Sequence, residues 1–200
     1  MLAAFFRHGS NALLATLIVG LLGLFAARAI PFVLWAAVAG AAVFFTSEYT
    51  THRFLFHAKP SRVPWIRTLQ HRLHYDHHVD PARLDLLFLP PWFTLPVTAL
   101  YFGLYALLTH SLPIAVCLTF GSLAALAYYE WVHYVAHIPF QPITPYGRWI
   151  KKYHLWHHFK NEHCWFGVTN PSMDVVMHTY APVSEAERSS TVREIWRSPK

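Results

Sequence analysis

The sequence has little charge and little cysteine. Only 13% of its 200 residues are charged while 54% are hydrophobic, a balance too apolar for a water-soluble domain of this length. The two cysteines, Cys117 and Cys164, are too few and too far apart in the sequence for a disulfide framework or a cysteine-based zinc or iron–sulfur site. Any bound metal must therefore be held mainly by nitrogen.

Several motifs of metal and cofactor proteins are also missing. The sequence has no HExxH, which excludes the common zinc-protease helix, and no GxGxxG, which excludes the common dinucleotide-binding loop. One ExxH occurs, at Glu130–His133, but a carboxylate-rich di-iron bundle needs two such motifs and two further glutamates facing inward. These classes of site are therefore excluded or disfavoured, and the sequence offers no GxGxxG loop for binding a nicotinamide cofactor.

Long uncharged runs take the place of charge. Residues 9–27 and 30–47 contain no charged side chain, and each run is long enough to cross about 30 Å of hydrocarbon as a helix. Residues 86–129 contain no Asp, Glu, Lys or Arg, and the turn-like "THSLP" at 109–113 divides them into two more passes. The sequence predicts an all-α integral membrane protein with four transmembrane helices in two hairpins. The expected spans are residues 12–27, 31–50, 92–108 and 113–136.

Positive charge predicts the orientation of these spans. Arg28 alone among the 16 Lys and Arg residues lies on the far side, and the other 15 lie on the side of both termini. This strong positive-inside pattern places both termini in the cytosol. It also accounts for the formal net charge of +6 without nucleic acid, because the basic residues flank membrane spans.

The first uncharged run has a second interpretation. Arg7 before it and "ARA" after it resemble a cleavable signal peptide, but the run is longer than the usual ~7–15 residues of such a segment, which favours a span. We expect a single domain over residues 1–200. Its parts outside the membrane are cytosolic segments at 51–85 and 137–180 and a polar tail at 182–200.

Histidine is concentrated in two windows. Six of the 15 histidines lie in residues 52–78 and six in residues 133–163. Each window directly follows the second or the fourth expected span, so an even number of crossings returns both windows to the cytosolic face. We expect them to meet there in a helical cap.

The spacing of the histidines favours metal binding. An isolated histidine near a membrane surface usually has a snorkelling or capping role, whereas histidines at i, i+3 and i+4 share a helical face and can aim at one point. His52 and His57 fit less well because five residues advance a helix by about 140°, so the helix ends there or the two serve different metals. Ten imidazoles exceed what one tetrahedral zinc ion can use, which implies two or more metals. The four groups are His52 and His57; His74, His77 and His78; His133 and His137; and His154, His157 and His158.

Carboxylates near these groups are candidates to orient the ligands. Ligating imidazoles commonly donate their other N–H to an acidic group, and Asp76, Asp80, Asp85 and Asp174 are placed for this, although each could be an ordinary solvated loop charge. Glu130 lies within the fourth expected span, one turn before His133, where an ionised group is costly without a partner. We expect Glu130 to contribute to the site.

Together the groups form the series HX4H, HX2HH, HX3H and HX2HH, separated by hydrophobic hairpins. With "FLPPW", "KKYHLWHHFKN" and "FGVTNPSMD", this series resembles the membrane-bound fatty acid hydroxylase superfamily, which includes sterol desaturases. The likeness is strongest to fatty acid 2-hydroxylases, over residues 45–180. An additional His71, "DPARLDLL" before the double proline and no fused cytochrome b5 domain distinguish the chain from eukaryotic members and favour a bacterial inner-membrane protein.

The resemblance implies a non-haem di-iron centre that uses O2 to hydroxylate a lipid acyl chain at the carbon next to the carbonyl. All ten histidines of the four groups would be ligands, zinc could replace iron in a purified protein, and His71 and His163 stay open. The resemblance also implies a lipid substrate in the membrane and a separate ferredoxin or cytochrome b5-type electron donor. A basic cytosolic face could dock that donor or anionic lipid; its residues are Arg148, Lys151, Lys152 and Lys160.

Two alternatives stay open. A sterol desaturase or carotenoid hydroxylase would share this chemistry but would need a wider slot for its rigid substrate. A metal transporter or store would not be an enzyme at all. A transporter is expected to place its ligands near the membrane midplane in broken helices, whereas these histidines lie at the cytosolic ends of the spans.

Overall fold

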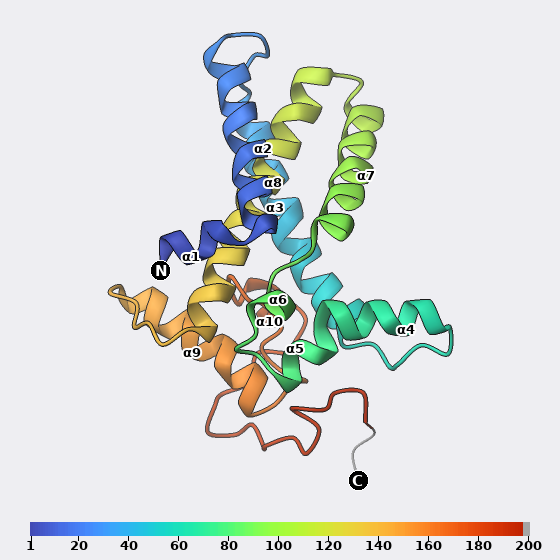
Figure 1. Ribbon diagram of the computed structural model, residues 1–200, viewed down its shortest axis with the longest axis vertical. Helices are drawn as coiled ribbons and strands as arrows, with labels where there is room; N and C mark the ends of the chain where they lie inside the picture. Colours follow the sequence, from blue (N-terminus) through green and yellow to red (C-terminus); the bar gives the residue numbers. More distant parts are fainter. Residues whose placement is uncertain (198–200) are drawn as a thin grey trace. The chain divides into compact units, whose positions relative to one another are not determined.

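The computed structural model describes residues 1–197, which contain helices and no β-strand (Figure 1). The last three positions of the expected polar tail, 198–200, lie outside the described residues. The chain divides into two compact units. We call Met1–Phe45 with Leu89–Glu130 the apolar unit, and Thr46–Phe88 with the chain from Trp131 onward the histidine unit.

The apolar unit contains the long hydrophobic helices. It comprises α1 (Leu2–Arg7), α2 (Gly9–Ala26), α7 (Pro91–Thr109) and the first parts of α3 (Leu34–Thr51) and α8 (Leu112–His137). Within residues 1–197, three segments are long and apolar enough to cross a membrane: Gly9–Ala26, Leu84–Thr109 and Leu112–His137. Helix α3 is not among them, since its last six residues, "TSEYTT", are mostly polar. A four-span layout therefore stays a prediction.

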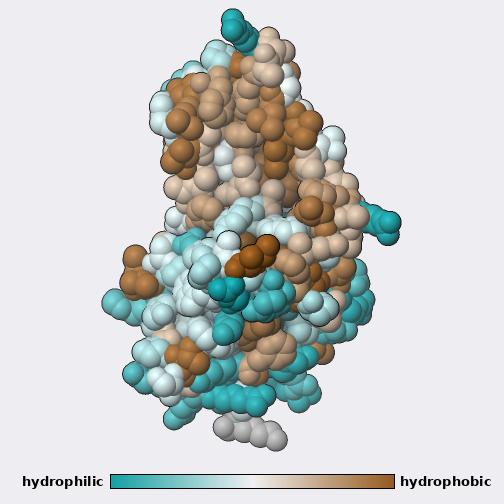
Figure 2. Space-filling model, turned by 90° about the vertical axis from the view of Figure 1, so that its left-hand side faces the viewer, coloured by the Kyte–Doolittle hydropathy of each residue, from teal (hydrophilic) through white to brown (hydrophobic). Residues whose placement is uncertain are grey.

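The surface of the apolar unit fits contact with lipid. Leu107, Leu108 and Val19 are all more than 60% exposed. On the face shown in Figure 2, hydrophobic residues gather over the helices of this unit and hydrophilic residues over the histidine unit. Contiguous exposed apolar surface of this kind is unusual in soluble proteins. The three apolar helices and this surface indicate an integral membrane protein.

Two glycines allow α3 and α8 to pack closely in the apolar unit. A Cβ added to Gly121 would lie 1.8 Å from the Ala37 carbonyl oxygen, and one added to Gly40 would lie 1.9 Å from the Leu118 carbonyl oxygen. The Ser122 hydroxyl also donates to the Gly40 carbonyl at 2.9 Å. Small residues commonly permit such close approach between membrane helices. The backbones of α3 and α8 can therefore approach this closely only because Gly40 and Gly121 have no side chain.

Replacing Gly121 by alanine should lower the free energy of unfolding by about 1–3 kcal/mol, because the new methyl group meets backbone that cannot rotate away. Gly103→Ala in α7 is the matched control, since a Cβ there would meet no described atom within 4 Å. Thermal unfolding in detergent compares the two variants. Equal tolerance of both substitutions would contradict the close crossing of α3 and α8.

The described part of the histidine unit contains the last parts of α3 and α8, five further α-helices and two π-helical turns. The α-helices are α4 (Pro64–Gln70), α5 (Asp76–Val79), α6 (Leu84–Leu87), α9 (Pro145–Phe159) and α10 (Ser172–Val176), and the π-helical turns are η1 (His52–Phe56) and η2 (His71–Tyr75). Helix α9 has a well-defined start, because the Thr144 hydroxyl accepts from the Gly147 N–H at 3.0 Å and Pro145 occupies the first turn. This cap fixes the helix that carries the last histidine group.

Candidate metal centre

The structure brings the ten predicted histidines together in two groups of five within the histidine unit. In each group, one ring nitrogen from every member lies within 4.8 Å of the others. The first group is His52, His57, His74, His78 and His157. The second group is His77, His133, His137, His154 and His158. His71 and His163 belong to neither group.

The π-helical turn η1 explains how histidines five residues apart share one group. The His57 N–H donates to the His52 carbonyl at 3.0 Å, an i+5 bond that widens the turn. Five residues then make little more than one turn, so His52 and His57 lie on nearly the same side. The α-helix does end at this pair, as one of the two sequence interpretations required, and the two side chains join the same group. Such π turns are frequent at functional sites.

Two of the four sequence groups contribute to both five-histidine groups. "HYDHH" sends His74 and His78 to the first group and His77 to the second. "HLWHH" sends His157 to the first and His158, with His154, to the second. The groups adjoin, since the ring centroids of His78 and His158 are 4.2 Å apart. One scaffold thus supports two neighbouring clusters.

The distances between ring nitrogens fit shared cations. His57 Nε2 lies 2.8 Å from His74 Nε2 and 3.0 Å from His157 Nε2. In the second group, His77 Nε2 lies 3.0 Å from His133 Nε2. A neutral imidazole has one N–H, so His57 Nε2 cannot satisfy both neighbours by hydrogen bonding. Two nitrogens that bind one metal at about 2.1 Å must lie within about 4.2 Å of each other, and these pairs do.

Backbone carbonyls orient three histidines of the first group. The Nδ1–H groups of His52, His78 and His157 donate to the carbonyls of Phe166, Val192 and Cys164, at 2.5, 3.0 and 2.8 Å. Each bond fixes the tautomer that leaves the Nε2 lone pair for a metal. The sequence had pointed to carboxylates for this task, and in this group carbonyls perform it.

Burial keeps these imidazoles neutral and leaves some nitrogens without a partner. It lowers the pKa of His52 to about 4 and that of His78 to about 3, so both are uncharged at neutral pH, the form that binds metal. In the described part of the chain, both ring nitrogens of the fully buried His158 lack a hydrogen bond, as does His78 Nε2. Buried polar atoms rarely stay unpaired, so the residues fit a bound cation.

Asp174 acts on the site through the backbone. It is fully buried, and its carboxylate accepts from the Phe166 N–H at 2.8 Å, the Gly167 N–H at 2.7 Å and the Thr179 hydroxyl at 2.7 Å. Phe166 in turn provides the carbonyl that accepts from His52. Asp174 therefore holds the loop that orients His52. The sequence had suggested a direct bond from an aspartate to a histidine of the cluster.

The other three aspartates are more exposed. Asp76 accepts from His71 Nδ1 at 2.9 Å, and the two side chains are 45% and 36% exposed. Asp80 is exposed at the end of α5. Asp85 pairs with Arg83, and the two side chains are 62% and 56% exposed. The structure thus places Asp76 on a histidine outside both groups and Asp80 and Asp85 at the surface.

Sequence reasoning missed Glu48. This buried carboxylate near the end of α3 accepts from the Val168 N–H at 2.7 Å and from the Thr169 N–H at 3.0 Å and hydroxyl at 2.6 Å. With Asp174 it holds the loop around Phe166 from a second side. The signal was available, since Glu48 lies in an expected span and an ionisable residue there calls for a partner, as argued for Glu130.

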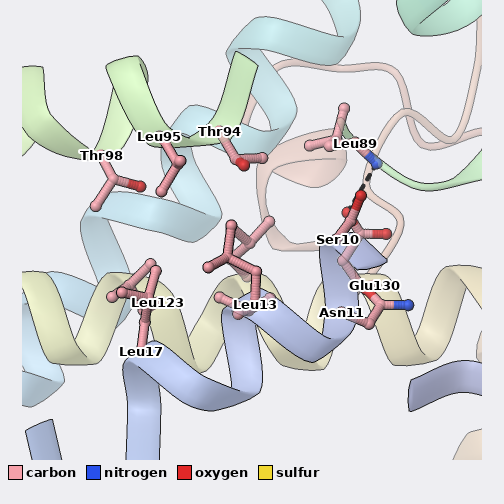
Figure 3. A pocket seen from close by; sticks show the side chains of 12 residues that line it. Ser10, Asn11, Leu13, Leu17, Leu89, Thr94, Leu95, Thr98, Leu123 and Glu130 are labelled. Atoms are coloured by element: carbon pink, nitrogen blue, oxygen red, sulfur yellow. Dashed lines mark hydrogen bonds between the residues drawn. The ribbon is translucent and has the colours of Figure 1, made fainter. Parts of the chain in front are cut away.

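Glu130 lies in the apolar unit and lines a small cavity formed by α2, α7 and α8 (Figure 3). It is 2% exposed, and its Oε1 accepts from the Leu89 N–H at 3.0 Å. In the described residues its Oε2 lacks a hydrogen bond, as does Oδ1 of Asn11, which lines the same cavity. Glu130 therefore anchors the chain just before α7.

Replacing Glu130 by alanine should lower the free energy of unfolding by about 1–3 kcal/mol, because the Leu89 N–H loses its acceptor. Glu130→Gln retains an acceptor oxygen and should lose less than half as much. Unfolding in detergent distinguishes these outcomes. Equal stability of the two variants would show that the bond to Leu89 is not what Glu130 contributes.

Three of the four basic residues predicted to dock a donor bind backbone carbonyls. Lys151 Nζ donates to the carbonyls of Val135, Ile138 and Phe140 at 2.7–2.9 Å, around the end of α8. The other two, Arg148 and Lys160, donate to carbonyls of the segments at 142–143 and 183. Lys152 is exposed. Arg148, Lys151 and Lys160 thus have structural contacts within the histidine unit.

Comparison with known proteins identifies the family. The fatty acid hydroxylase family model matches residues 37–179, a range that includes all ten histidines of the two groups. The chain belongs to the fatty acid hydroxylase family. The solved structure titled full length scs7p, with only its hydroxylase domain visible, has a TM-score of 0.78 at 29% identity and covers 90% of this chain and 68% of that one.

Curated relatives of this hydroxylase-family chain include plant and animal proteins. Dihydroceramide fatty acyl 2-hydroxylase FAH2 of Arabidopsis thaliana is 34% identical over 144 residues, which are 72% of this chain and 59% of that protein. Fatty acid 2-hydroxylase of Rattus norvegicus is 32% identical over 148 residues, covering 72% of this chain and 39% of that protein. The chain therefore spans less than two thirds of the length of these relatives.

Proposed function

We propose that this protein is an O2-dependent hydroxylase that acts on an acyl chain of a membrane lipid, most favourably at the carbon next to the carbonyl. The observation that carries the proposal is the pair of adjoining five-histidine groups in a chain of the fatty acid hydroxylase family. The names of the relatives, a dihydroceramide fatty acyl 2-hydroxylase and a fatty acid 2-hydroxylase, support this substrate class.

The proposed cofactor is two iron ions, one for each group of histidines. Side chains cannot break an unactivated C–H bond, and redox-active ions with O2 supply that chemistry when bound. Imidazole accepts zinc as readily as iron, but zinc cannot exchange electrons, so we assign zinc only to a protein loaded outside the cell. The chain itself contributes neutral imidazoles, carbonyls that aim them, and burial that excludes water.

The proposed topology adds α3 as a fourth span and places the histidine unit on the cytosolic side. Arg28 is the one lysine or arginine that would lie on the opposite side of the membrane from the termini. This distribution of positive charge supports that orientation. We further propose a bacterial inner-membrane location, one functional domain over residues 1–200, and a separate ferredoxin or cytochrome b5-type donor. These 200 residues contain no GxGxxG loop for a nicotinamide cofactor, which supports the proposal of a separate donor.

Lipid mass spectrometry tests the proposed function. Cells that express the chain with a compatible donor should accumulate acyl lipids heavier by one oxygen, and fragmentation should place that oxygen at the second carbon. A loss of two hydrogens would indicate the desaturase alternative, and an oxygen on a carotenoid would indicate a different substrate. Unchanged lipids together with altered cellular metal content would indicate a transporter or store.

A further inference from the structure

The segment Ser189–Trp196, which we call the closing segment, lies beyond the residues matched by the family model. The sequence predicts only a polar tail there. In the structure, Thr191 and Val192 are 6% and 4% exposed, so the segment is packed into the histidine unit. Its contacts reach two of the elements that carry ligands.

One end of the closing segment is anchored just after α9. The Ser189 N–H donates to the Lys160 carbonyl at 2.8 Å. The hydroxyls of Ser189 and Thr191 donate to the same Glu162 oxygen at 2.8 and 2.5 Å, and Glu162 is 1% exposed. Since α9 carries three histidines of the two groups, this anchor ties the segment to the scaffold of the site.

The middle of the closing segment holds His78. The Val192 carbonyl accepts from His78 Nδ1 at 3.0 Å, and the Arg193 guanidinium donates to the His78 carbonyl at 2.8 Å and to the Val79 carbonyl. The same guanidinium lies 5.3 Å from the centre of the Phe159 ring at the end of α9. Both the ring and the backbone of His78 are therefore fixed by this segment.

We propose that the closing segment positions the first five-histidine group. The Val192 carbonyl selects the His78 tautomer whose Nε2 faces the other ligands, and Arg193 fixes the backbone from which that ring projects. The inference rests on the proposed function, since it treats His78 as a metal ligand. The inference predicts different behaviour for the two groups, because the histidine that the closing segment holds, His78, belongs to the first group.

Zinc retention tests the inference, with purified full-length protein loaded with zinc(II) and titrated with a colorimetric chelator. Orienting partners of ligating histidines contribute about 10–100-fold to metal affinity. Arg193→Gln should therefore release one zinc per chain at roughly 10–100-fold lower chelator concentration and retain the other as in the wild type. The double variant Ser189→Ala/Thr191→Val, which leaves His78 untouched but weakens the anchor, should shift the same zinc.

Arg197→Gln is the matched control, because Arg197 pairs with Glu194 at the surface, with side chains 65% and 42% exposed. It should leave both zinc ions as in the wild type. Unchanged retention in both test variants, or equal weakening of both zinc ions, would overturn the positioning role. Wild-type protein that binds no zinc would instead overturn the proposed metal centre itself, and the inference with it.

Discussion

Alanine at His157 is expected to lower hydroxylation more than about 100-fold and to leave about one metal per chain, since even an orienting partner of a ligand contributes about 10–100-fold. His157 is fully buried in the first group, and His158 next to it belongs to the second. His158→Ala should therefore cause the same loss of activity while removing the other metal. Metal analysis of the purified variants and product assays in membranes provide the two measurements.

The matched control for these substitutions is His163→Ala. His163 follows within the same stretch of sequence, its side chain is 66% exposed, and it belongs to neither group. Activity and metal content should stay at wild-type values in this variant. A His157→Ala protein that retained both metals and its product would remove His157 from the proposed ligands.

Replacing Asp174 by alanine is expected to lower the free energy of unfolding by roughly 3 kcal/mol or more. Three buried donors lose their acceptor, and each unpaired buried group costs about 1–3 kcal/mol. Activity should fall as well, because the loop that orients His52 through the Phe166 carbonyl is released. Asp174→Asn keeps one carbonyl-type acceptor and should lose about half as much stability.

Thermal unfolding in detergent and product formation measure the Asp174 effects together. Asp80→Ala is the control from the same initial set of candidate carboxylates, and its exposed position predicts a change within about 0.5 kcal/mol. If Asp80→Ala and Asp174→Ala behaved alike, the loop would not depend on the buried carboxylate.

The histidine positions were readable from the sequence, but their partition was not. Spacing at i+3 and i+4 predicts a shared helical face, which holds for His133 and His137 in α8. The π-helical turn that aligns His52 with His57 could not be predicted, because local propensity does not separate an i+4 from an i+5 bond. Which side of α5 faces which cluster depends on how α5, α8 and α9 pack.

The carboxylates show the same limit. Burial cost alone indicated that Glu130 needs a partner, and it would equally have indicated Glu48. The partners themselves, the Leu89 N–H for Glu130 and the loop at 168–169 for Glu48, lie 41 and about 120 residues away in the sequence. No periodicity connects residues that far apart.

The sequence by itself determined the chemical class of this protein: an apolar chain for a membrane, nitrogen as the metal donor, and enough imidazole for two ions. Composition and short spacings act within a few residues, so they can be read along the chain. Only the tertiary structure decided which five rings form each cluster and which carbonyls aim them. The Val192 carbonyl reaches His78 across 114 residues, and such contacts exist only after the chain has packed.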